Sequence, residues 1–597
     1  MSGIERGLEL MSRIPVRLLA GFMLVMNMVP CTAAQSSTPD CATLEACIGE
    51  LSALARRPSH DRHSLTGEES ALIERVLSFD DAASALAPLL AHSNVNVADL
   101  ASAALARVQH IDPTYLPRIV AGLDRGLGWL APALGRMQTD EAASEAVDRF
   151  LVSESAPENQ EAFAVVLSGT HAVPAILERA RCTGGCDEGL HYLLGAVLRR
   201  MNEDSRRLAA PGLIAIARDP ATSQSVASGA LEMIAKLGDA GLIAEAPLLE
   251  LRRRSPQLRN WIDTALIGIR STASGEIFAR RLRDAPDDIA LGDVAETGRA
   301  AVDAGSAVVE VLDGSDDPEV RIAAARALGY IGYMPGVTSL IARLHDPVDP
   351  RMVGVAAEAL GRLQAQEALP ALDATAEQHW FVGARQAASE AARHIREHSA
   401  YVSRYPPDNF RLEFFSYQFS GEQLGDCKRP MLDLLEESAE RKLRVRADPA
   451  ASARIAELTK NSGGSRSGTE AVPHVALRVE DGWLMGSDQG EWGGELTFVG
   501  DDGDRQLVFS DNIENIVRLG DRLVAVTGLA HLISHGAVIE LQRDGRRWSA
   551  RTWRVLPDAP QASALVRPGN LFVKTDNGNL VLISPEGQMS AAQCAEE

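Results

Sequence analysis

The sequence predicts an α-solenoid of helix pairs followed by a small all-β domain. Two internal repeats support this prediction, because a repeat identifies an architecture more securely than any single element does. The first repeat joins an Asp-Pro step to a run rich in alanine and leucine, and it recurs after 32 residues, from position 328 to position 360. In the second repeat, the turn glycines between β-forming segments fall at positions 503, 545 and 587, two steps of 42.

The helical repeat is clearest where its two Asp-Pro steps fall, at Asp317-Pro318 and Asp349-Pro350. Aspartate caps the start of a helix and proline suits its first turn, so each step predicts a helix N-terminus. A second apolar segment follows each unit, at 337–344 and at 368–376. A helix, a turn, a second helix and then a new Asp-Pro step predict an α-solenoid, which we extend over residues 41–399.

Glycines complete the repeat. Gly329 and Gly361 close the alanine-rich runs, and because glycine adopts the left-handed conformation at little cost they predict the helix ends. These residues resemble HEAT-like repeats, in particular the short variety first named for phycobilin lyases. The resemblance implies a curved helical scaffold that binds a partner, and it implies no catalytic residues.

The composition limits the classes of partner. The 597 residues exceed what one hydrophobic core organises, so at least two regions are expected. The formal net charge of −22 argues against nucleic acid or an anionic membrane surface as the main partner, since both require a basic face. The two repeat systems, each of a kind that builds binding surfaces, predict a protein partner instead.

The N-terminus has the features of an export signal over residues 1–34. Two arginines precede a short apolar core, and small residues follow up to Ala34. The apolar run is too short to span a bilayer comfortably. Cys31 allows a lipid anchor as a second interpretation, which Pro30 disfavours because a small residue is needed there. The expected location is therefore periplasmic or secreted, with no integral membrane domain after cleavage.

Cleavage after Ala34 would remove one of the seven cysteines and leave an even number. Export and an even count together predict disulfide bonds, whose pairing the sequence does not determine. A Cys41–Cys47 bridge requires Cys41 to lie before its helix begins, because six residues of helix separate the two positions by about 9 Å. The candidate disulfide cysteines are Cys41, Cys47, Cys182, Cys186, Cys427 and Cys594.

Residues 400–470 form a transitional segment. Its first half predicts a strand at 411–417 and a helix at 432–443, and a glycine- and serine-rich stretch at 461–468 predicts a flexible linker. The strand could add to the β domain that follows.

The last region, residues 471–597, is predicted to be all-β. Pairs of β-forming segments lead to turns at Asp502-Gly503, Asp544-Gly545 and Glu586-Gly587, and such turns are hairpin signals. A period near 42 resembles the four-stranded blade of a β-propeller. Three blades are fewer than a closed ring normally has. An open sandwich of three similar hairpins is therefore an almost equal alternative, and a Cys427–Cys594 bridge would suit ring closure.

No sequence motif identifies a catalytic, cofactor or metal site. Four tryptophans gather in the last fifth of the chain, and we expect Trp483, Trp548 and Trp553 to pack in the core. Trp492 differs, because it lies in a glycine-rich loop that could present its ring to a ligand. The chain is accordingly predicted to be an exported protein-binding scaffold. The alternative is an envelope enzyme, a lyase or a hydrolase, whose site the sequence does not reveal.

Overall fold

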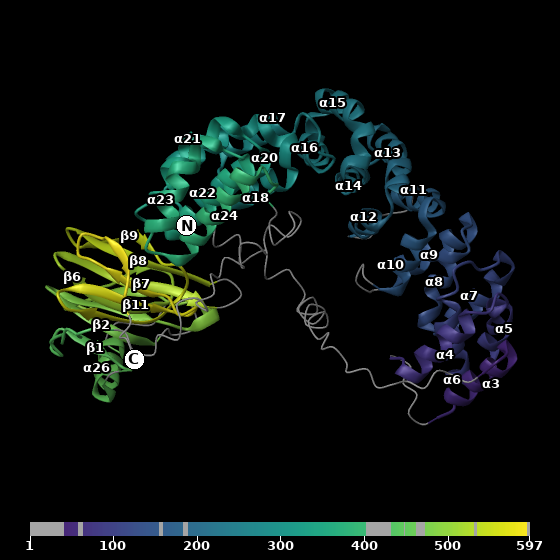
Figure 1. The fold of residues 1–597 in the computed structure, drawn as a ribbon, viewed down its shortest axis with the longest axis horizontal. Coiled ribbons are helices and arrows are strands. Elements are labelled where there is room, and N and C mark those ends of the chain that lie inside the picture. The colour runs from purple at the N-terminus through teal and green to yellow at the C-terminus, as the bar shows by residue number, and fades with distance from the viewer. Residues whose placement is uncertain are drawn as a thin grey trace. The chain divides into compact units, whose positions relative to one another are not determined.

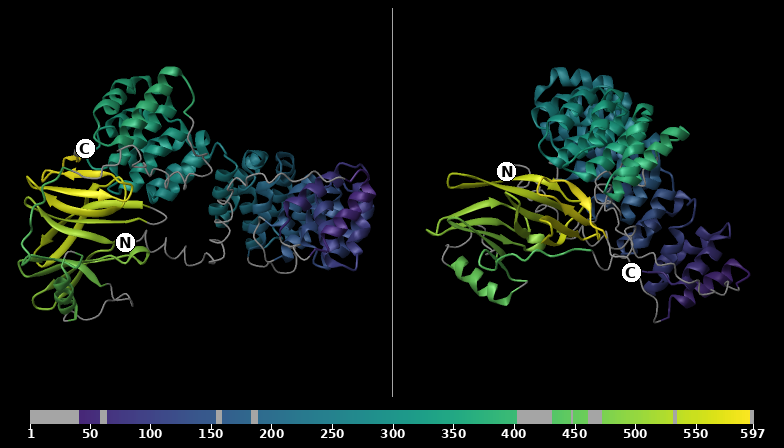
Figure 2. Two further views of the ribbon diagram at one scale, coloured as in Figure 1. Left: turned by 60° about the horizontal axis from the view of Figure 1, so that its bottom comes forward. Right: turned by 60° about the vertical axis from the view of Figure 1, so that its left-hand side comes forward.

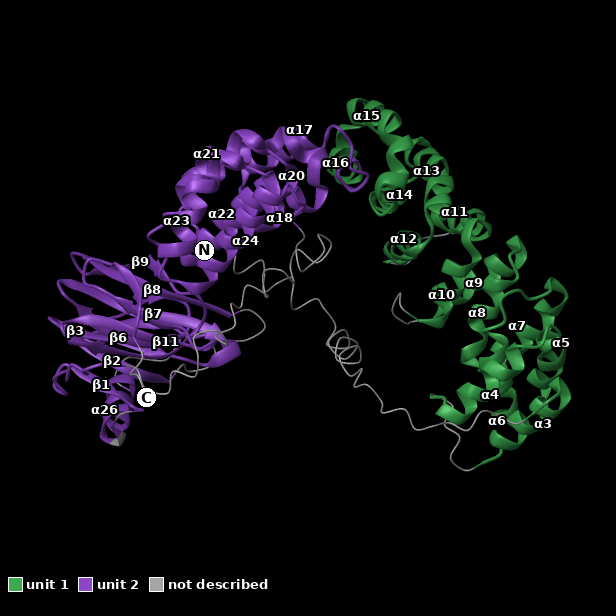
Figure 3. Ribbon diagram, viewed as in Figure 1, with its two compact units in different colours: residues 1–265 green, residues 266–597 purple. Residues whose placement is uncertain are grey.

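A computed structural model describes residues 41–57, 64–153, 159–182, 189–401, 431–446, 448–460, 472–530 and 534–593. The chain divides into two compact units, residues 1–265 and 266–597 (Figure 3). The first unit is helical, and the second contains the last helical repeats together with the β domain (Figure 1).

Helix pairs build the first unit. Helices α8, α10, α12 and α14 pack in succession as one layer, and α9, α11, α13 and α15 pack in succession as the other. The helices are α3 (Leu44–Leu54), α4 (Gly67–Leu77), α5 (Ala82–Leu86), α6 (Val95–Leu105), α7 (Leu116–Asp124), α8 (Ala131–Arg136), α9 (Asp140–Val152), α10 (Gln160–Ser168), α11 (Val173–Arg181), α12 (Leu190–Arg200), α13 (Glu203–Arg218), α14 (Gln224–Ala235), α15 (Glu245–Arg254) and α16 (Arg259–Gly268), which ends in the second unit.

The same two-layer plan continues in the second unit. Helices α18, α20, α22 and α24 pack in succession, and α17, α19, α21 and α23 alternate with them along the chain. Their bounds are α17 (Ser274–Asp284), α18 (Asp288–Thr297), α19 (Gly305–Gly314), α20 (Pro318–Ile331), α21 (Val337–Arg343), α22 (Pro350–Leu363), α23 (Leu369–Gln378) and α24 (Val382–Glu397). The predicted α-solenoid of helix pairs is confirmed.

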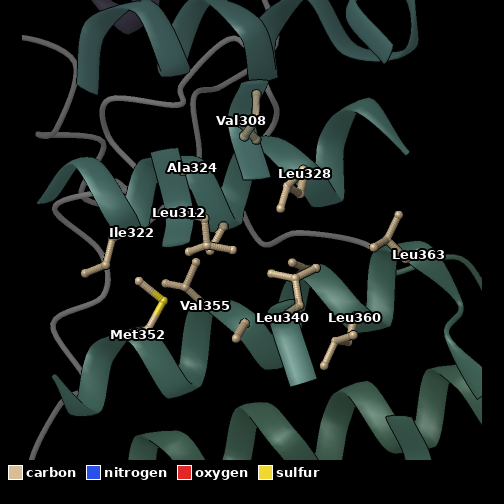
Figure 4. Close-up of a cluster of buried hydrophobic side chains, with 14 of the residues drawn as sticks. Val308, Leu312, Ile322, Ala324, Leu328, Leu340, Met352, Val355, Leu360 and Leu363 are labelled. Carbon is tan, nitrogen blue, oxygen red and sulfur yellow. The ribbon is translucent and has the colours of Figure 1, made fainter. Parts of the chain in front are cut away.

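The predicted caps of α20 and α22 are also confirmed. The carboxylates of Asp317 and Asp349 accept hydrogen bonds from the first-turn amides of Glu319 and Arg351, each at 2.9 Å. Buried apolar side chains of α19 to α22 then meet in one core (Figure 4). The labelled members of this core are Val308, Leu312, Ile322, Ala324, Leu328, Leu340, Met352, Val355, Leu360 and Leu363.

The predicted role of the two repeat glycines is wrong. Gly329 and Gly361 lie inside α20 and α22, and the left-handed residues that end these helices are Gly332 and Gln364. A Cβ at Gly329 would lie 2.8 Å from the Cα of Ala359 on the neighbouring helix. The glycine is therefore needed for the close approach of two helices, not for a turn.

The β domain contains three antiparallel sheets. Their strands follow chain order: β1 to β5, β6 to β9 and β10 to β13. The bounds are β1 (Lys442–Arg444), β2 (Pro473–Val479), β3 (Gly482–Ser487), β4 (Leu496–Gly500), β5 (Arg505–Phe509), β6 (Ile513–Leu519), β7 (Arg522–Ala530), β8 (Ser534–Asp544), β9 (Arg547–Val555), β10 (Pro560–Val566), β11 (Asn570–Thr575), β12 (Leu580–Ile583) and β13 (Met589–Ala591).

The 42-residue period corresponds to four consecutive strands of one sheet, β2 to β5, β6 to β9 or β10 to β13, and β1 adds a fifth strand to the first sheet. Gly503, Gly545 and Gly587 all have positive φ, and each lies in the turn between the last two strands of its sheet. The sheets stack face to face, because alternate residues of the middle sheet are buried against the other two. Ile516 packs toward the first sheet and Val517 toward the third. The small all-β domain is confirmed, its stacked sheets agree with either a propeller-like or a sandwich arrangement, and its described strands form no closed barrel.

Part of the transitional segment belongs to the β domain. The segment 432–443 was predicted to be a helix, but Leu434 forms a β-bridge with Val566 and Lys442 begins strand β1. Helix α26 (Pro449–Lys460) covers the outer face of the first sheet through Ile455 (Figure 2). The predicted strand 411–417 and the linker 461–468 lie outside the described residues.

Inter-helix loops join the β domain to the last repeats. The amide of Val555 donates to the carbonyl of Val348, in the loop between α21 and α22, at 2.8 Å. Trp380, between α23 and α24, packs against both the helical core and the core of the second and third sheets. These repeats and the β domain therefore share one compact unit.

The close approach at Gly329 gives a stability prediction. Replacing Gly329 by alanine should destabilise the chain by about 1–3 kcal/mol, because the backbone of α22 must shift to admit the methyl group. The matched control is Gly314→Ala in α19, where nothing lies within 4 Å of the new Cβ. Thermal unfolding followed by circular dichroism compares the two variants. Equal melting temperatures would contradict the packing role of Gly329.

Candidate interaction site

Trp492 is the large apolar side chain with the highest exposure among the described residues, with 88% of its surface accessible. It ends a short 3₁₀ turn, Gly490–Trp492, in the loop between β3 and β4. Of the other three tryptophans in the last fifth of the chain, two are buried as predicted and one only in part. Trp548 and Trp553 are buried, and Trp483 is partly buried against the core beneath α26.

The loop that carries Trp492 is held in place by its own backbone. The amide of Gln489 donates to the carbonyl of Gly493 at 3.1 Å, and the amide of Gly493 donates to the carbonyl of Gly490 at 3.0 Å. Gly490 and Gly493 both have positive φ, which glycine adopts without a steric penalty. The tight turn therefore depends on glycine at these two positions.

Asn512 fixes the loop to the second sheet. Its side-chain nitrogen donates to the carbonyl of Gly490 at 2.8 Å, and its side-chain oxygen accepts from the amide of Gln489 at 3.0 Å. The Asn512 side chain is itself buried. An exposed indole on a loop already ordered loses little conformational freedom on binding, which is the property of an effective contact residue.

A polar cluster lies beside this loop, at the start of the innermost strands. Strands β2, β6 and β10 each contain a bulge at the same place, and the extra residues are His474, Glu514 and Gln561. Bulges redirect a side chain out of the regular pleat. Three equivalent bulges thus place a polar residue at the start of β2, of β6 and of β10.

Arg444 links these inner strands. Its guanidinium donates to the carboxylate of Glu514 and to the carbonyl of Ser563, the latter at 3.1 Å. The hydroxyl of Ser563 donates to the second carboxylate oxygen of Glu514, and Asn515 donates to that hydroxyl at 2.8 Å. The network explains how a short strand, β1, connects all three sheets.

His474 and Arg446 connect the cluster to the Trp492 loop. Burial lowers the pKa of His474, and the nearby charge of Arg446 adds to this effect. The Nε2 atom of His474 is buried and has no hydrogen-bond partner among the described residues. Arg446 lies 3.7 Å from Asp488, at the start of the loop, and 61% of the Arg446 side chain is exposed. An ion pair and a histidine of lowered pKa therefore lie where the loop that carries Trp492 begins.

A second grouping, Ser399–His394–Glu390, has the composition of a hydrolase triad. Arg393 approaches Nε2 of His394 at 3.0 Å, and a guanidinium donates only. Nε2 is therefore the acceptor, and Nδ1–H donates to the Ser399 hydroxyl at 2.8 Å. Because Nδ1 already carries a proton, it does not accept one from the serine, and this grouping does not activate a nucleophile.

The structure contains one of the anticipated disulfides within its described residues. Cys41 and Cys47 are bonded with a Cα–Cα distance of 5.1 Å, and Cys41 precedes α3, as the bridge requires. Cys182 is disulfide-bonded as well. Cys186, Cys427 and Cys594 lie outside the described residues.

Among the described residues, no group of three or more histidine, cysteine, aspartate or glutamate side chains could hold a metal ion. No described helix is long and apolar enough to cross a membrane.

Comparison with known proteins identifies the helical region. A family model described as HEAT repeats matches residues 305–393, which span α19 to most of α24. This family model describes HEAT repeats in general, so it does not confirm the more specific resemblance to phycobilin-lyase repeats. Among curated proteins no match is found. A crystal structure described as an engineered protein is 16% identical to this chain, and the alignment covers 60% of this chain and 97% of the other. Its TM-score of 0.22 is too low to indicate a shared fold.

The two hydrogen bonds of the Asn512 side chain should hold the Trp492 loop in place. Replacing Asn512 by alanine should raise hydrogen exchange in residues 488–494 by about fivefold to 150-fold, since the loss of two hydrogen bonds of about 0.5–1.5 kcal/mol each loosens the loop. Trp492→Ala is the control, because the ring contributes to no hydrogen bond that fixes the loop. Unchanged exchange in Asn512→Ala would show that the backbone turn suffices.

Proposed function

We propose that this chain is an exported scaffold that binds a protein partner through its β domain and its HEAT repeats. The observation that supports the proposal most directly is Trp492, an exposed indole on a loop fixed by Asn512. HEAT repeats present extended helical surfaces, and the family match at residues 305–393 places such repeats next to the β domain in sequence.

Protein is the class of partner that fits these features. Exposed tryptophans beside polar side chains are typical of the residues that dominate binding energy at protein interfaces. The net charge of −22 disfavours nucleic acid, whose phosphates need a basic face. Arg446 and Asp488 supply the polar rim that such an indole usually has.

Export is supported by the cysteine chemistry. The signal-like residues 1–34 precede the Cys41–Cys47 disulfide by a few positions. Disulfides persist in oxidising compartments and are rare in the cytosol. We therefore place the mature chain in the periplasm or outside the cell, starting near residue 35.

The mature form can be tested by mass. Protein purified from its native compartment should have an intact mass that fits residues 35–597 less six hydrogens, one pair for each of three disulfides. Reduction should restore the six hydrogens. A full-length mass with free thiols would contradict export, and a lipid-modified mass beginning at Cys31 would assign an anchor instead.

The contact role of Trp492 can be tested by crosslinking. A photoreactive phenylalanine at position 492 should yield a discrete adduct in envelope extracts, whereas the same residue at Leu507, 55% exposed on β5 of the same sheet, should not. Unlabelled wild-type protein should compete for the adduct about 30-fold better than Trp492→Ala, the cost of about 2 kcal/mol at an anchor residue. Equal adducts at both positions would contradict a specific site.

A further inference from the structure

Four equivalent loops lie along one edge of the helical repeats in the second unit. Each loop ends at the residue that caps the next helix of the layer α18, α20, α22 and α24. The caps are Asp287, Asp317, Asp349 and Phe381, at steps of 30, 32 and 32 residues. Because these helices pack in succession, the four loops follow one another in space, and we call them the loop edge.

The β domain occupies the last two loops of this edge. Before α22, the carbonyl of Val348 accepts the 2.8 Å hydrogen bond from the amide of Val555. Before α24, Trp380 packs against the core of the second and third sheets. Val348 and Trp380 each directly precede the residue that caps their helix. The position before the cap is therefore the contact position of the loop edge.

The first two loops, before α18 and α20, have the same capping geometry but are exposed. The carboxylates of Asp287 and Asp317 lie 2.7 Å and 2.9 Å from the backbone amides that they cap. Residues 284–289 are all exposed, and so are four of the five residues 313–317. Asp349, the cap in the loop that meets the β domain, is fully buried. One edge thus has two covered loops and two free ones.

The exposed loops are strongly negative. They contain no lysine or arginine, and their aspartates are Asp284, Asp287, Asp288, Asp313, Asp316 and Asp317. Two of these are the caps, and Asp313 pairs with Arg343 at 2.8 Å. Asp284 and Asp316 take part in no hydrogen bond or ion pair within the described part of the chain. Asp284 is also the last residue of α17, where the helix dipole disfavours a negative charge. Helix stability therefore does not explain these two carboxylates.

We propose that the loops before α18 and α20 are a docking edge for a basic segment of a protein partner, which continues the row of contacts that the β domain begins. The carboxylates of Asp284 and Asp316 attract lysine or arginine side chains of that segment. The carbonyl of Asp316, at the position equivalent to Val348, accepts a backbone amide as Val348 does. The inference rests on the proposed function, since it specifies where the HEAT repeats meet a protein partner and which charge that partner carries.

The other large classes of partner fit this edge poorly. Nucleic acids and anionic membrane surfaces have the same sign of charge as the exposed loops, so both are repelled. A basic protein segment supplies the opposite charge together with the backbone amide that the contact position binds. Charge complementarity and continuity with the β-domain contact therefore lead to the same occupant.

A binding assay with a defined peptide tests the edge. The probe is a short fluorescein-labelled peptide of alternating lysine and threonine, titrated with the full-length chain at physiological ionic strength and followed by fluorescence anisotropy. The double variant Asp284→Asn/Asp316→Asn should bind it about twofold to thirtyfold more weakly than the wild type, as expected for the loss of two exposed ion pairs.

The matched control neutralises two exposed carboxylates at the opposite ends of the same helices. Glu296 lies in the last turn of α18, and Glu367 follows the end of α22. The variant Glu296→Gln/Glu367→Gln changes the net charge by the same amount and should bind the peptide as the wild type does. Equal weakening by both double variants would overturn the proposal, because the overall charge of the chain would then explain the binding.

Hydrogen exchange of the wild-type chain locates the peptide without any substitution. The peptide should slow exchange in residues 284–290 and 313–319. Protection confined to other segments overturns the proposal, and so does protection of these loops by calcium chloride but not by the peptide, which would make the edge a cation site. The assay does not involve Trp492. A crosslinked adduct at position 492 together with equal binding by both double variants would overturn the docking edge alone and leave the proposed function standing.

Discussion

The helical region depends on the close approach of successive helices across small side chains. At Gly329 the neighbouring atoms belong to Ala359, and at Gly361 they belong to Ala391 and Tyr401. Long runs of buried alanine in α20 and α22 serve the same purpose. Close helices bring more side-chain atoms into contact, and the many weak attractions between those atoms stabilise the stack. Each repeat is stable only because its neighbours cover it.

One short motif shows how polar groups then connect the repeats. Leu-Gly-Arg-x-Gln occurs at 134–138 and again at 360–364. In both copies the glutamine has positive φ and ends the helix, and its side chain donates to a carbonyl of the next repeat: Gln138 to Leu167 at 2.8 Å and Gln364 to Ser399 at 2.9 Å. The motif therefore combines a packing glycine, a helix end and an inter-repeat hydrogen bond.

The β domain uses repetition for a different purpose. Its turn glycines recur because each sheet ends in the same kind of hairpin, and its bulges recur because β2, β6 and β10 each bend at the same point. Arg444 then joins the inner edges, and the loops at Val348 and Trp380 join the domain to the helices. The site around Trp492 and the junction at Val348 and Trp380 both result from these connections.

The sequence by itself determined the repeats, the helix caps at Asp317 and Asp349, the hairpin glycines and the isolation of Trp492. Each of these depends on local chemistry: a carboxylate over free amides, a positive φ, an apolar ring among glycines.

The tertiary structure decided what the sequence predicted wrongly or did not predict. Gly329 was expected to end a helix, because glycine has the same local preference at a turn and at a close contact, and only the neighbouring helix distinguishes the two. The cluster of Arg444, His474 and Glu514 joins residues far apart in the chain. No spacing in the sequence records such contacts, because the packing of separate elements creates them.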